Sequence, residues 1–584
     1  SGRKLYCKKN WEHILSRYIN HTYETNMKLL KIILKWLSIS VLLLFVILVA
    51  GSYILYATAD MKQPDLDEKS LTEKPLYLSD SLRTYGNNSL LLNKQGLWEL
   101  YVHGKPFERG VAIGKMSEDL LYYQEKVFVD EIKNIIPSEK YLKFLRYFLI
   151  IFNRNLGEYF PQENREEIYG ISLSCTHEFD AIGTPYERQL NYHGAHDIGH
   201  MMQAYMLVGC SSFGTWGSQS SDSTLIIGRN FDFYMGDDFA KHKIVAFYTP
   251  SEGYKFASVG WMGMTGVLSG MNEAGLTVTI NAAQASIPTG SATPISILAR
   301  IILQYASTID EAYKIAQEHK TFVAESLLIG SAKDGIAAII EKSPNKIGIF
   351  YSDTERIVCT NHYQSDAFRF DAKNMENIRT TDSDYRFRRI NELLNRTKQI
   401  DPQHAVQILR DTLGLNDREI GLTNEKSINQ FIAHHSVVFK PNELKMWVST
   451  SPWQLGEYIV YDLKDIFSPG SILFSQSNAT KDQIIMADGG LTSGTFMRVT
   501  EYRKLKNEIT RAINNKNSLS KEVLQNFIHS NANYYYTYEL LGDYYLSQGK
   551  KGMAIDYWQQ ALAFEIPRIG DKDNIEKKIR NIKK

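Results

Sequence analysis

The segment VGCSSF at residues 208–213 is followed, at residues 222–233, by DSTLIIGRNFDF. Both segments carry the β-branched and aromatic runs that are typical of strands, and the polar residues between them predict a hairpin turn. Such a hairpin would bring Arg229 and Asp232 back toward Cys210. A cysteine at the start of a strand is usually a small buried hydrophobic residue. A nearby cation, however, lowers the pKa of a thiol, so this combination favours a nucleophile at Cys210.

The residues that follow the hairpin alternate between strand and helix patterns. Short β-rich runs continue to about residue 283, two helical stretches occupy 294–306 and 308–319, and strand patterns return up to about residue 449. Strands, a helical pair and strands again predict an α+β domain of layered, antiparallel sheet. We expect this catalytic domain to span residues 210–498.

Several segments in this region resemble one known family. GCSSF…GRNFDF resembles the N-terminal-nucleophile hydrolases of the penicillin acyltransferase type (peptidase C45), which are relatives of the choloylglycine hydrolases. Four later segments resemble further segments of this family, in the same order: SGMNEAGLTVTINAA (269–283), VCTNHY (358–363), DYRFRRINELL (384–394) and LKMWVSTSPWQLGEYIVYDL (444–463). The resemblance covers about residues 95–465. It implies a four-layer αββα sandwich and cleavage of the chain before the nucleophile.

The resemblance also implies a set of site residues. Cleavage between Gly209 and Cys210 would give Cys210 a free α-amine, which titrates near pH ~8 and can act as a base for its own thiol. The thiol would then attack an amide carbonyl and form a thioester, without a cofactor or a metal. In this scheme Arg229 stabilises the nucleophile and contacts substrate, and Asp232 holds the amine. The remaining residues are two oxyanion donors and an arginine that orients Asp232 or its neighbours: Asn281, Asn361 and Arg386, with Arg389 as an alternative to Arg386.

Two further features of the sequence leave alternatives open. His193, His196 and His200 form an HxxHxxxH pattern around Asp197, and two histidines four residues apart can share a helix face as metal ligands. A complete ligand set is not visible, so we prefer a polar helix packed near the nucleophile. In an oxidising compartment a Cys175–Cys359 disulfide is conceivable, although sequence separation does not test it.

The N-terminal region predicts a membrane segment. Residues 36–59 carry no charge before Asp60, follow three lysines, and as a helix would span about 36 Å. We expect an uncleaved anchor, with a cleaved signal peptide as the competing interpretation. Residues 1–35 would then be cytoplasmic, with 1–26, which precede the first methionine, as a non-native or upstream segment. The catalytic domain would lie outside the cytoplasm, in the periplasm or the extracellular space.

The other boundaries follow from composition and helical spacing. We expect a linker at 60–94, a helical precursor segment (the α-chain) at 95–209, and a helical region at 499–584 with the spacing of one tetratricopeptide repeat. After cleavage the α-chain and the β-chain would remain associated. The repeat-like tail offers a surface for a protein partner, or simply caps the catalytic domain.

Charge and composition narrow the function. The chain has 584 residues with 66 Lys+Arg against 65 Asp+Glu, and a net charge of +1 argues against nucleic-acid binding. We expect a membrane-anchored, self-processing thiol amidase that cleaves linear, non-peptide amide bonds in small N-acyl or lipid-like compounds. The alternatives are acyl transfer to an amine, and a non-catalytic surface scaffold that binds partners through its helical tail.

Overall fold

The computed structural model describes residues 2–57, 62–66, 74–135, 155–201, 207–284, 292–468 and 483–583, together with residues 138, 147 and 153. The chain divides into two units, which we describe separately. The smaller unit comprises residues 1–60 and 147–154, and the larger unit comprises 61–146 and 155–584.

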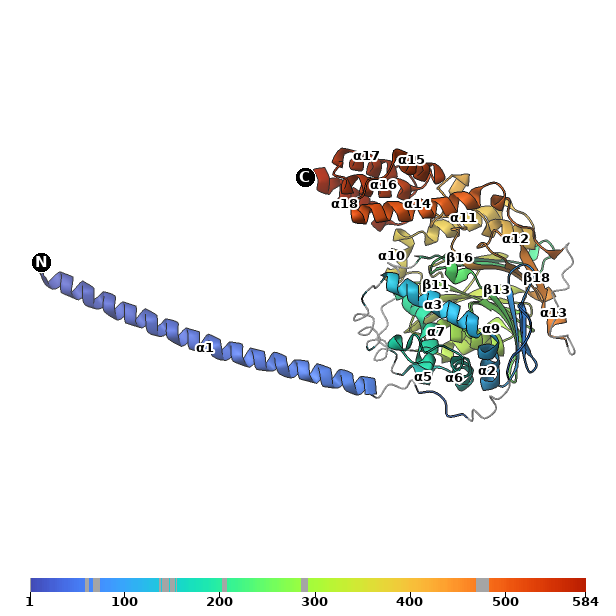
Figure 1. Cartoon of the computed structure of the whole chain (residues 1–584), viewed down its shortest axis with the longest axis horizontal. Helices are drawn as coiled ribbons and strands as arrows, with labels where there is room; N and C mark the ends of the chain where they lie inside the picture. Colours follow the sequence, from blue (N-terminus) through green and yellow to red (C-terminus); the bar gives the residue numbers. More distant parts are fainter. Residues whose placement is uncertain are drawn as a thin grey trace. The chain divides into compact units, whose positions relative to one another are not determined.

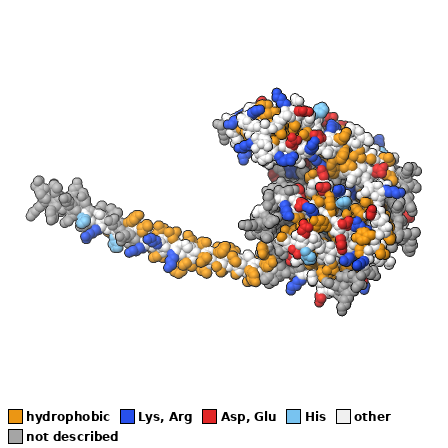
Figure 2. Space-filling model, in the orientation of Figure 1, with side chains coloured by type: hydrophobic (Ala, Val, Ile, Leu, Met, Phe, Trp, Pro, Cys, Tyr) orange, Lys and Arg blue, Asp and Glu red, His pale blue; other side chains and the backbone are white. Residues whose placement is uncertain are grey.

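The smaller unit is dominated by one long helix, α1 (Gly2–Ala57). Within its stretch Met27–Tyr56 an 18-residue window has a mean hydropathy of 2.8 and no buried residue, and Figure 2 shows mostly apolar side chains along this part of the helix. It is the one helix among the described residues that is long and apolar enough to cross a membrane, a property that a signal sequence shares. The apolar stretch begins earlier than the expected anchor at 36–59, and residues 58–60 lie outside the described part of the chain.

Two β-sheets form the centre of the larger unit. Over the described residues the first has eleven strands in the order β1-β2-β3-β4-β8-β9-β10-β11-β12-β13-β14, and the second has the order β15-β6-β7-β16-β17-β18 with β5 paired to β7. The bounds in the first sheet are β1 Leu76–Ser79, β2 Leu82–Tyr85, β3 Asn88–Leu92, β4 Trp98–Gly104, β8 Ile244–Pro250, β9 Phe256–Gly260, β10 Ser269–Asn272, β11 Leu276–Ala282, β12 Glu325–Ser331, β13 Ile336–Ser343 and β14 Lys346–Tyr351. Those in the second are β5 Leu207–Val208, β6 Ser211–Thr215, β7 Ile226–Tyr234, β15 Arg356–Cys359, β16 Ala433–Lys440, β17 Lys445–Ser449 and β18 Tyr458–Asp462.

The main hydrophobic core lies between these sheets. Because side chains alternate along a strand, one face of each sheet points toward the other. Val245 and Ile339 of the first sheet meet Val437 and Val448 of the second in one buried cluster. Burial of this apolar surface is the dominant favourable term that holds the sheets together.

Helices cover the outer faces of both sheets (Figure 1). Helix α8 (Ile295–Tyr305) packs on β10 and β11, followed by α9 (Ile309–Glu318) against β12 and β13, and α11 (Ser383–Arg396) and α12 (Pro402–Leu409) cover the second sheet. The layers therefore run helices, sheet, sheet, helices, in agreement with the mixed, layered α+β fold expected from the sequence. Two shorter helices are α10 (Ala372–Thr380) and α13 (Leu463–Ile466).

The segment expected to be a linker is partly β-structure. Residues 76–92 form β1, β2 and β3, and β4 continues this group into a parallel pairing with β8, from Trp98 opposite Ile244 to Gly104 opposite Pro250. Gly86 and Asn87 form the turn between β2 and β3, where Gly86 has a φ of +53°. The residues before Cys210 thus contribute strands to the sheet formed by the residues after it.

Helices follow these strands in the precursor segment. They are α2 (Pro106–Met116), α3 (Glu118–Ile135), α5 (Leu156–Tyr159), α6 (Gln162–Ser172) and α7 (Pro185–Met201). Helices α6 and α7 share a buried cluster with α8, which lies after Cys210 in the sequence. The described helices before Cys210 therefore pack with the residues after it in one body.

The C-terminal region is helical, as expected. It consists of α14 (Thr495–Asn515), α15 (Lys521–Ser530), α16 (Tyr535–Ser547), α17 (Lys551–Ala561) and α18 (Ile569–Lys583), which enclose their own core around the fully buried Trp558. Glu565 connects this region to the segment before β16, because it accepts from Arg418 at 2.6 Å and from Lys426 at 2.7 Å.

Candidate functional site

The hairpin of β6 and β7 brings Arg229 to Cys210. Cys210 lies at the start of β6 and is 1% exposed, and its Sγ accepts a hydrogen bond from Arg229 Nη2 at 3.7 Å. Three further hydrogen bonds fix the position of the guanidinium. It donates to the carbonyl of Leu268 at 2.8 Å, to Ser269 Oγ and to the carbonyl of Ile280. A fixed cation therefore faces the thiol, as the sequence predicted.

Asp232 lies on the same strand and is fully buried. Its backbone carbonyl accepts from the N–H of Gly209 at 3.2 Å, so it contacts the peptide next to Cys210. Neither of its carboxylate oxygens has a hydrogen-bond partner among the described residues. Burial raises the pKa of Asp232 to about 7, although Arg386 and Arg229 oppose that shift. A carboxyl group with this pKa can accept or release a proton near neutral pH.

The thiol itself is not activated in the intact chain. Burial raises the pKa of Cys210, and Arg229 lowers it only in part. The thiol therefore needs a base to become a thiolate, either from a buried carboxylate or from the α-amine that chain cleavage would release.

Arg386 contacts the backbone of Cys210. Its Nη1 donates to the carbonyl of Cys210 at 2.7 Å, its Nη2 donates to Asn361 Oδ1 at 2.7 Å, and Asp382 fixes the guanidinium at 2.9 and 3.1 Å. Of the two expected roles, orienting Asp232 or its neighbours, the hydrogen bonds of Arg386 fit the second, because they go to Cys210, Ser211 and Asn361 and not to the Asp232 carboxylate. The alternative, Arg389, points to a separate carboxylate, that of Asp411, at 2.9 Å.

The two asparagines lie beside the site, but their amide nitrogens bind backbone carbonyls. Asn281 Nδ2 donates to the carbonyl of Cys359 at 3.1 Å, and Asn361 Nδ2 donates to the carbonyl of Ala282 at 2.9 Å. Asn281 Oδ1 in turn accepts from Ser212 Oγ at 3.0 Å. Because an amide nitrogen carries two N–H groups, an oxyanion role for either side chain would use the second N–H.

Two residues at the site were missed in the sequence. Gln430 Nε2 donates to the carbonyl oxygen of Gly209 at 3.2 Å, and His435 Nε2 lies 2.8 Å from Ser269 Oγ, the hydroxyl bound by Arg229. Both come from the segment around β16, whose sequence contains no spacing pattern that links it to Cys210. Only the pairing of β16 with β7 brings them close.

The histidine pattern does not form a metal site where it is described. His193 is 1% exposed, its Nδ1 lies 2.7 Å from the carbonyl of Gln189, and its Nε2 lies 3.0 Å from the N–H of Thr265. Burial lowers the pKa of His193 to about 4. Its neutral ring therefore connects α7 to Thr265 by hydrogen bonds. The side chains of His196, Asp197 and His200 lie outside the described residues, and the described residues contain no cluster of three or more metal-ligating side chains.

The other cysteines are separate from one another. Cys175, Cys210 and Cys359 are free thiols in the structure, so the conceivable Cys175–Cys359 disulfide is not formed. Cys359 is fully buried at the end of β15, and Cys175 accepts from Gln189 Nε2 at 3.3 Å.

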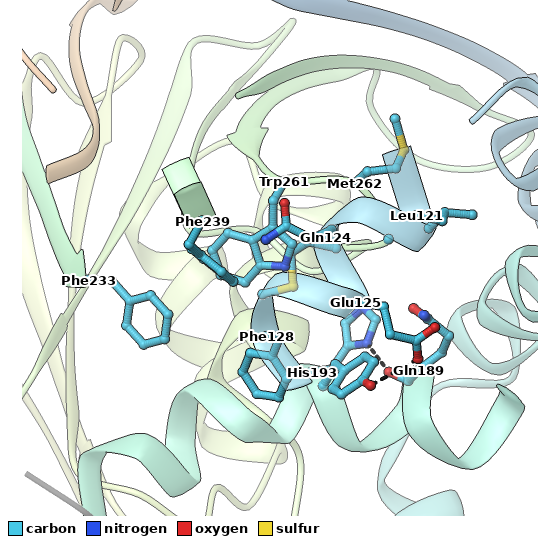
Figure 3. A pocket seen from close by; sticks show the side chains of 13 residues that line it. Leu121, Gln124, Glu125, Phe128, Gln189, His193, Phe233, Phe239, Trp261 and Met262 are labelled. Carbon is cyan, nitrogen blue, oxygen red and sulfur yellow. Dashed lines mark hydrogen bonds between the residues drawn. The ribbon is translucent and has the colours of Figure 1, made fainter. Parts of the chain in front are cut away.

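An apolar pocket lies next to β7, the strand that carries Arg229. Arg229 stacks on Phe231 at 4.5 Å, Phe231 stacks on Phe233 at 5.7 Å, and Phe233 stacks on Trp261 at 5.9 Å. Phe233 and Trp261 line a small, mostly apolar pocket, whose other wall comes from helices α3 and α7, which precede Cys210 in the sequence (Figure 3). The pocket therefore lies between residues that precede Cys210 and residues that follow it.

Comparison with known proteins agrees with this geometry. Residues 218–451 match the family model of acyl-coenzyme A:6-aminopenicillanic acid acyl-transferase. The match begins after Gly209 and Cys210 and includes Arg229, Asp232, Asn281, Asn361 and Arg386. Protein dcd1B of Dictyostelium discoideum is 23% identical over 275 residues, which are 44% of this chain and 52% of that protein. An uncharacterised protein of Archaeoglobus fulgidus is 24% identical over 277 residues, covering 44% and 45%. This chain thus spans about half the length of the curated relatives it matches.

Two solved structures are also similar. The Caenorhabditis elegans N-acylethanolamine-hydrolyzing acid amidase ortholog is 16% identical, with a TM-score of 0.30, over 40% of this chain and 93% of that one. Penicillin V acylase from Agrobacterium tumefaciens is 17% identical, with a TM-score of 0.30, over 44% and 86%. The family match together with the Cys210 hairpin confirms the resemblance drawn from the sequence: over residues 218–451 the chain is similar to the penicillin acyltransferase type of N-terminal-nucleophile hydrolase.

Proposed function

We propose that this protein is a self-processing cysteine amidohydrolase, of the peptidase C45 type, that cleaves the amide bond of small N-acyl compounds. The observation that carries the proposal is the contact of Arg229 with the buried thiol of Cys210, in a chain whose Gly209–Cys210 peptide is anchored on both sides. The matched family is named for acyl transfer, which supports acyl chemistry at this thiol.

The proposed reaction begins with self-cleavage. Once the Gly209–Cys210 bond is broken, the free amine of Cys210 takes the thiol proton, and the carbonyl of Asp232 or its carboxylate holds that amine. The thiolate, faced by Arg229, attacks the substrate carbonyl and releases the amine product. Water then hydrolyses the thioester. Asn281 and Asn361 are the proposed oxyanion donors, each worth about 3 kcal/mol of barrier if it binds the charge directly.

The pocket supports an acyl substrate. Its wall includes Phe233, which stacks on Phe231, the ring that Arg229 covers, so the pocket lies along the same strand as the cation that faces Cys210. The apolar chain of a substrate would occupy this pocket. Gln124, which is 6% exposed, lines the pocket, and its Nε2 has no hydrogen-bond partner among the described residues. A buried amide donor of this kind favours an acyl chain or head group with one polar atom.

The two chains produced by cleavage would stay together. The parallel pairing of β4 with β8 joins the α-chain to the β-chain within one sheet, and the buried carboxylate of Glu167 binds Arg109 of the α-chain and Arg300 of the β-chain. Separation would expose sheet edges and buried charges.

We also propose that α1 anchors the protein in a membrane, with the catalytic domain on the non-cytoplasmic side. The apolar length of Met27–Tyr56 and the lysines at its start support this orientation. The helical tail would then hold the catalytic body or bind a protein partner, as its repeat-like spacing suggests.

Acyl transfer to an amine is the second candidate, favoured by the name of the matched family. A shared thioester would serve both reactions, and the choice depends on whether water or an amine reaches it first. A non-catalytic scaffold is the remaining alternative.

Intact mass and N-terminal sequencing of purified protein, beside Cys210→Ala, test the proposal. We expect two chains in the wild type, the second beginning Cys-Ser-Ser-Phe, and one chain in the variant. A panel of N-acyl amides, with and without an added amine acceptor, then separates hydrolysis from transfer. A single chain in both proteins, with equal and negligible turnover, would contradict the enzyme assignment.

A further inference from the structure

The peptide between Gly209 and Cys210 is held at three points. The N–H of Gly209 donates to the Asp232 carbonyl at 3.2 Å, and the carbonyl of Cys210 accepts from Arg386 at 2.7 Å. These two bonds fix the flanks. The third bond, from Gln430 Nε2 at 3.2 Å, is made to the oxygen of the carbonyl that must react if Cys210 cleaves its own chain.

The position of Gln430 is set by a constrained loop. Gln430 is 2% exposed, and the next residue, Phe431, has a φ of +58°, a conformation that non-glycine residues rarely adopt. Phe431 is held from both sides, since its N–H donates to Asn429 Oδ1 at 3.0 Å and its carbonyl accepts from Arg503 Nη2 at 2.6 Å. Backbone strain of this kind persists only where the surroundings enforce it. The loop therefore presents the amide in one place.

The glycine before the nucleophile fits this contact. A methyl group on the Cα of Gly209 would lie 2.7 Å from Gln430 Nε2, which is closer than such atoms approach one another. A larger residue at position 209 would push the amide away from the carbonyl. Gly209 and Gln430 thus form a matched pair, although they are far apart in the sequence.

We infer that Gln430 is a catalytic residue of self-cleavage and donates the hydrogen bond that stabilises the oxyanion formed on Gly209. This inference rests on the proposed self-processing and adds the residue that promotes it. The Sγ of Cys210 attacks the Gly209 carbonyl carbon, and negative charge develops on the oxygen that faces Nε2. The C–N bond then breaks, the thiol proton passes to the departing nitrogen of Cys210, and a thioester remains. Water hydrolyses that thioester, which leaves the Gly209 carboxylate and restores the thiol.

The test measures the rate of cleavage in full-length protein made by pulsed cell-free translation, followed by intact mass. Gln430→Ala should slow cleavage by about 100-fold, the usual loss for one oxyanion donor. Gln454→Ala is the matched control, because Gln454 is also fully buried but donates to the carbonyl of Leu409, at 3.4 Å. Its cleavage rate should stay within about threefold of the wild type, since it loses only an ordinary hydrogen bond.

Gln430→Glu preserves the shape of the side chain and covers the case in which Gln430→Ala fails to fold. The ionised carboxylate cannot donate, so cleavage at neutral pH should be as slow as in Gln430→Ala. Relative to the wild type at the same pH, its rate should recover as the pH falls, because the protonated carboxyl regains a donor.

The outcomes separate the inference from the proposed function. If the wild type is not cleaved and matches Cys210→Ala, self-processing is wrong and the inference falls with it. If the wild type is cleaved and either Gln430 variant is cleaved at the same rate at neutral pH, only the role of Gln430 is overturned. Slow cleavage in both Gln430 variants, with a normal rate in Gln454→Ala, supports it.

Discussion

A buried ion triad ties the precursor helices to the catalytic body, and Glu167→Gln should break it. Glu167 on α6 accepts from Arg109 on α2 at 2.6 and 3.0 Å and from Arg300 on α8 at 3.2 Å. All three side chains are at most 1% exposed. The glutamine has the same shape but no charge, so it leaves two guanidinium groups buried without their carboxylate.

The expected loss of stability is about 3–5 kcal/mol, the usual effect of removing one partner from a buried ion pair. Its pH dependence follows from the pKa of Glu167. Burial alone would raise that pKa, but Arg300 and Arg109 lower it below its ordinary 4.5. A carboxyl group whose folded pKa is lowered stabilises the fold above its unfolded pKa and loses that contribution as the pH falls through the folded value. The difference between wild type and variant should therefore be complete at neutral pH and shrink well below pH 4.5.

Urea unfolding followed by circular dichroism measures this difference. Both substitutions are made in Cys210→Ala, so that the chain stays in one piece. Glu163→Gln is the matched control, because Glu163 lies on the same helix and contacts α8 through the neutral side chains of Gln304, at 3.0 Å, and Tyr305, at 2.8 Å. It should cost about 1 kcal/mol or less. Equal losses in the two variants, or a Glu167→Gln loss that does not change at acid pH, would refute the reasoning.

Three further predictions concern the site. The rate of self-cleavage in the wild type should rise with pH and level off above about pH 7, because burial raises the pKa of Asp232 to about 7. Asp232→Asn should cleave at least ~100-fold more slowly, because the variant has lost the proton acceptor. Intact mass of samples stopped at fixed times measures both rates. Arg386→Ala should slow cleavage by about tenfold or more, because Arg386 binds the carbonyl of Cys210. Arg389→Ala removes a bond to the remote carboxylate of Asp411, so it should lower the urea midpoint but leave the cleavage rate of folded protein within about threefold of the wild type. The reverse pattern would contradict the roles given to these two arginines. Trp261→Ala should lower kcat/KM for long-chain N-acyl amides about tenfold, which corresponds to roughly 1.4 kcal/mol, and should leave kcat/KM for acetyl amides nearly unchanged. Equal effects on both kinds of substrate would show that the acyl chain binds elsewhere.

The sequence predicted the nucleophile hairpin because the relevant interactions are local. Cys210 directly precedes β6, and Arg229 lies on β7, the next strand along the chain, which pairs with β6 so that Ser212 lies opposite Arg229. The strand and helix patterns of the catalytic region were likewise visible, since period-two and helical spacing are properties of short windows. The same local evidence misjudged 76–92, where short strands with a polar turn look like a linker until their partners are known.

The choice between Arg386 and Arg389 shows where sequence evidence stops. Both are buried on α11, one turn of the helix apart, and both bind a carboxylate. Only the orientation of α11 on the second sheet directs one guanidinium to the carbonyl of Cys210 and the other to Asp411. A motif can indicate that an arginine is needed, but it does not specify the rotation of the helix that carries it.

The sequence alone thus indicated a thiol beside a cation, a layered α+β domain, a long apolar helix and a helical tail, because each depends on residues close together in the chain. The contact of Gln430 with Gly209, the parallel pairing of β4 with β8 and the Glu167 triad were decided only by tertiary structure. Their partners are distant in sequence, and they meet because the apolar faces of two sheets and their covering helices can be buried together in one way. Once that burial is complete, the polar groups it encloses must find partners among whatever side chains lie near them.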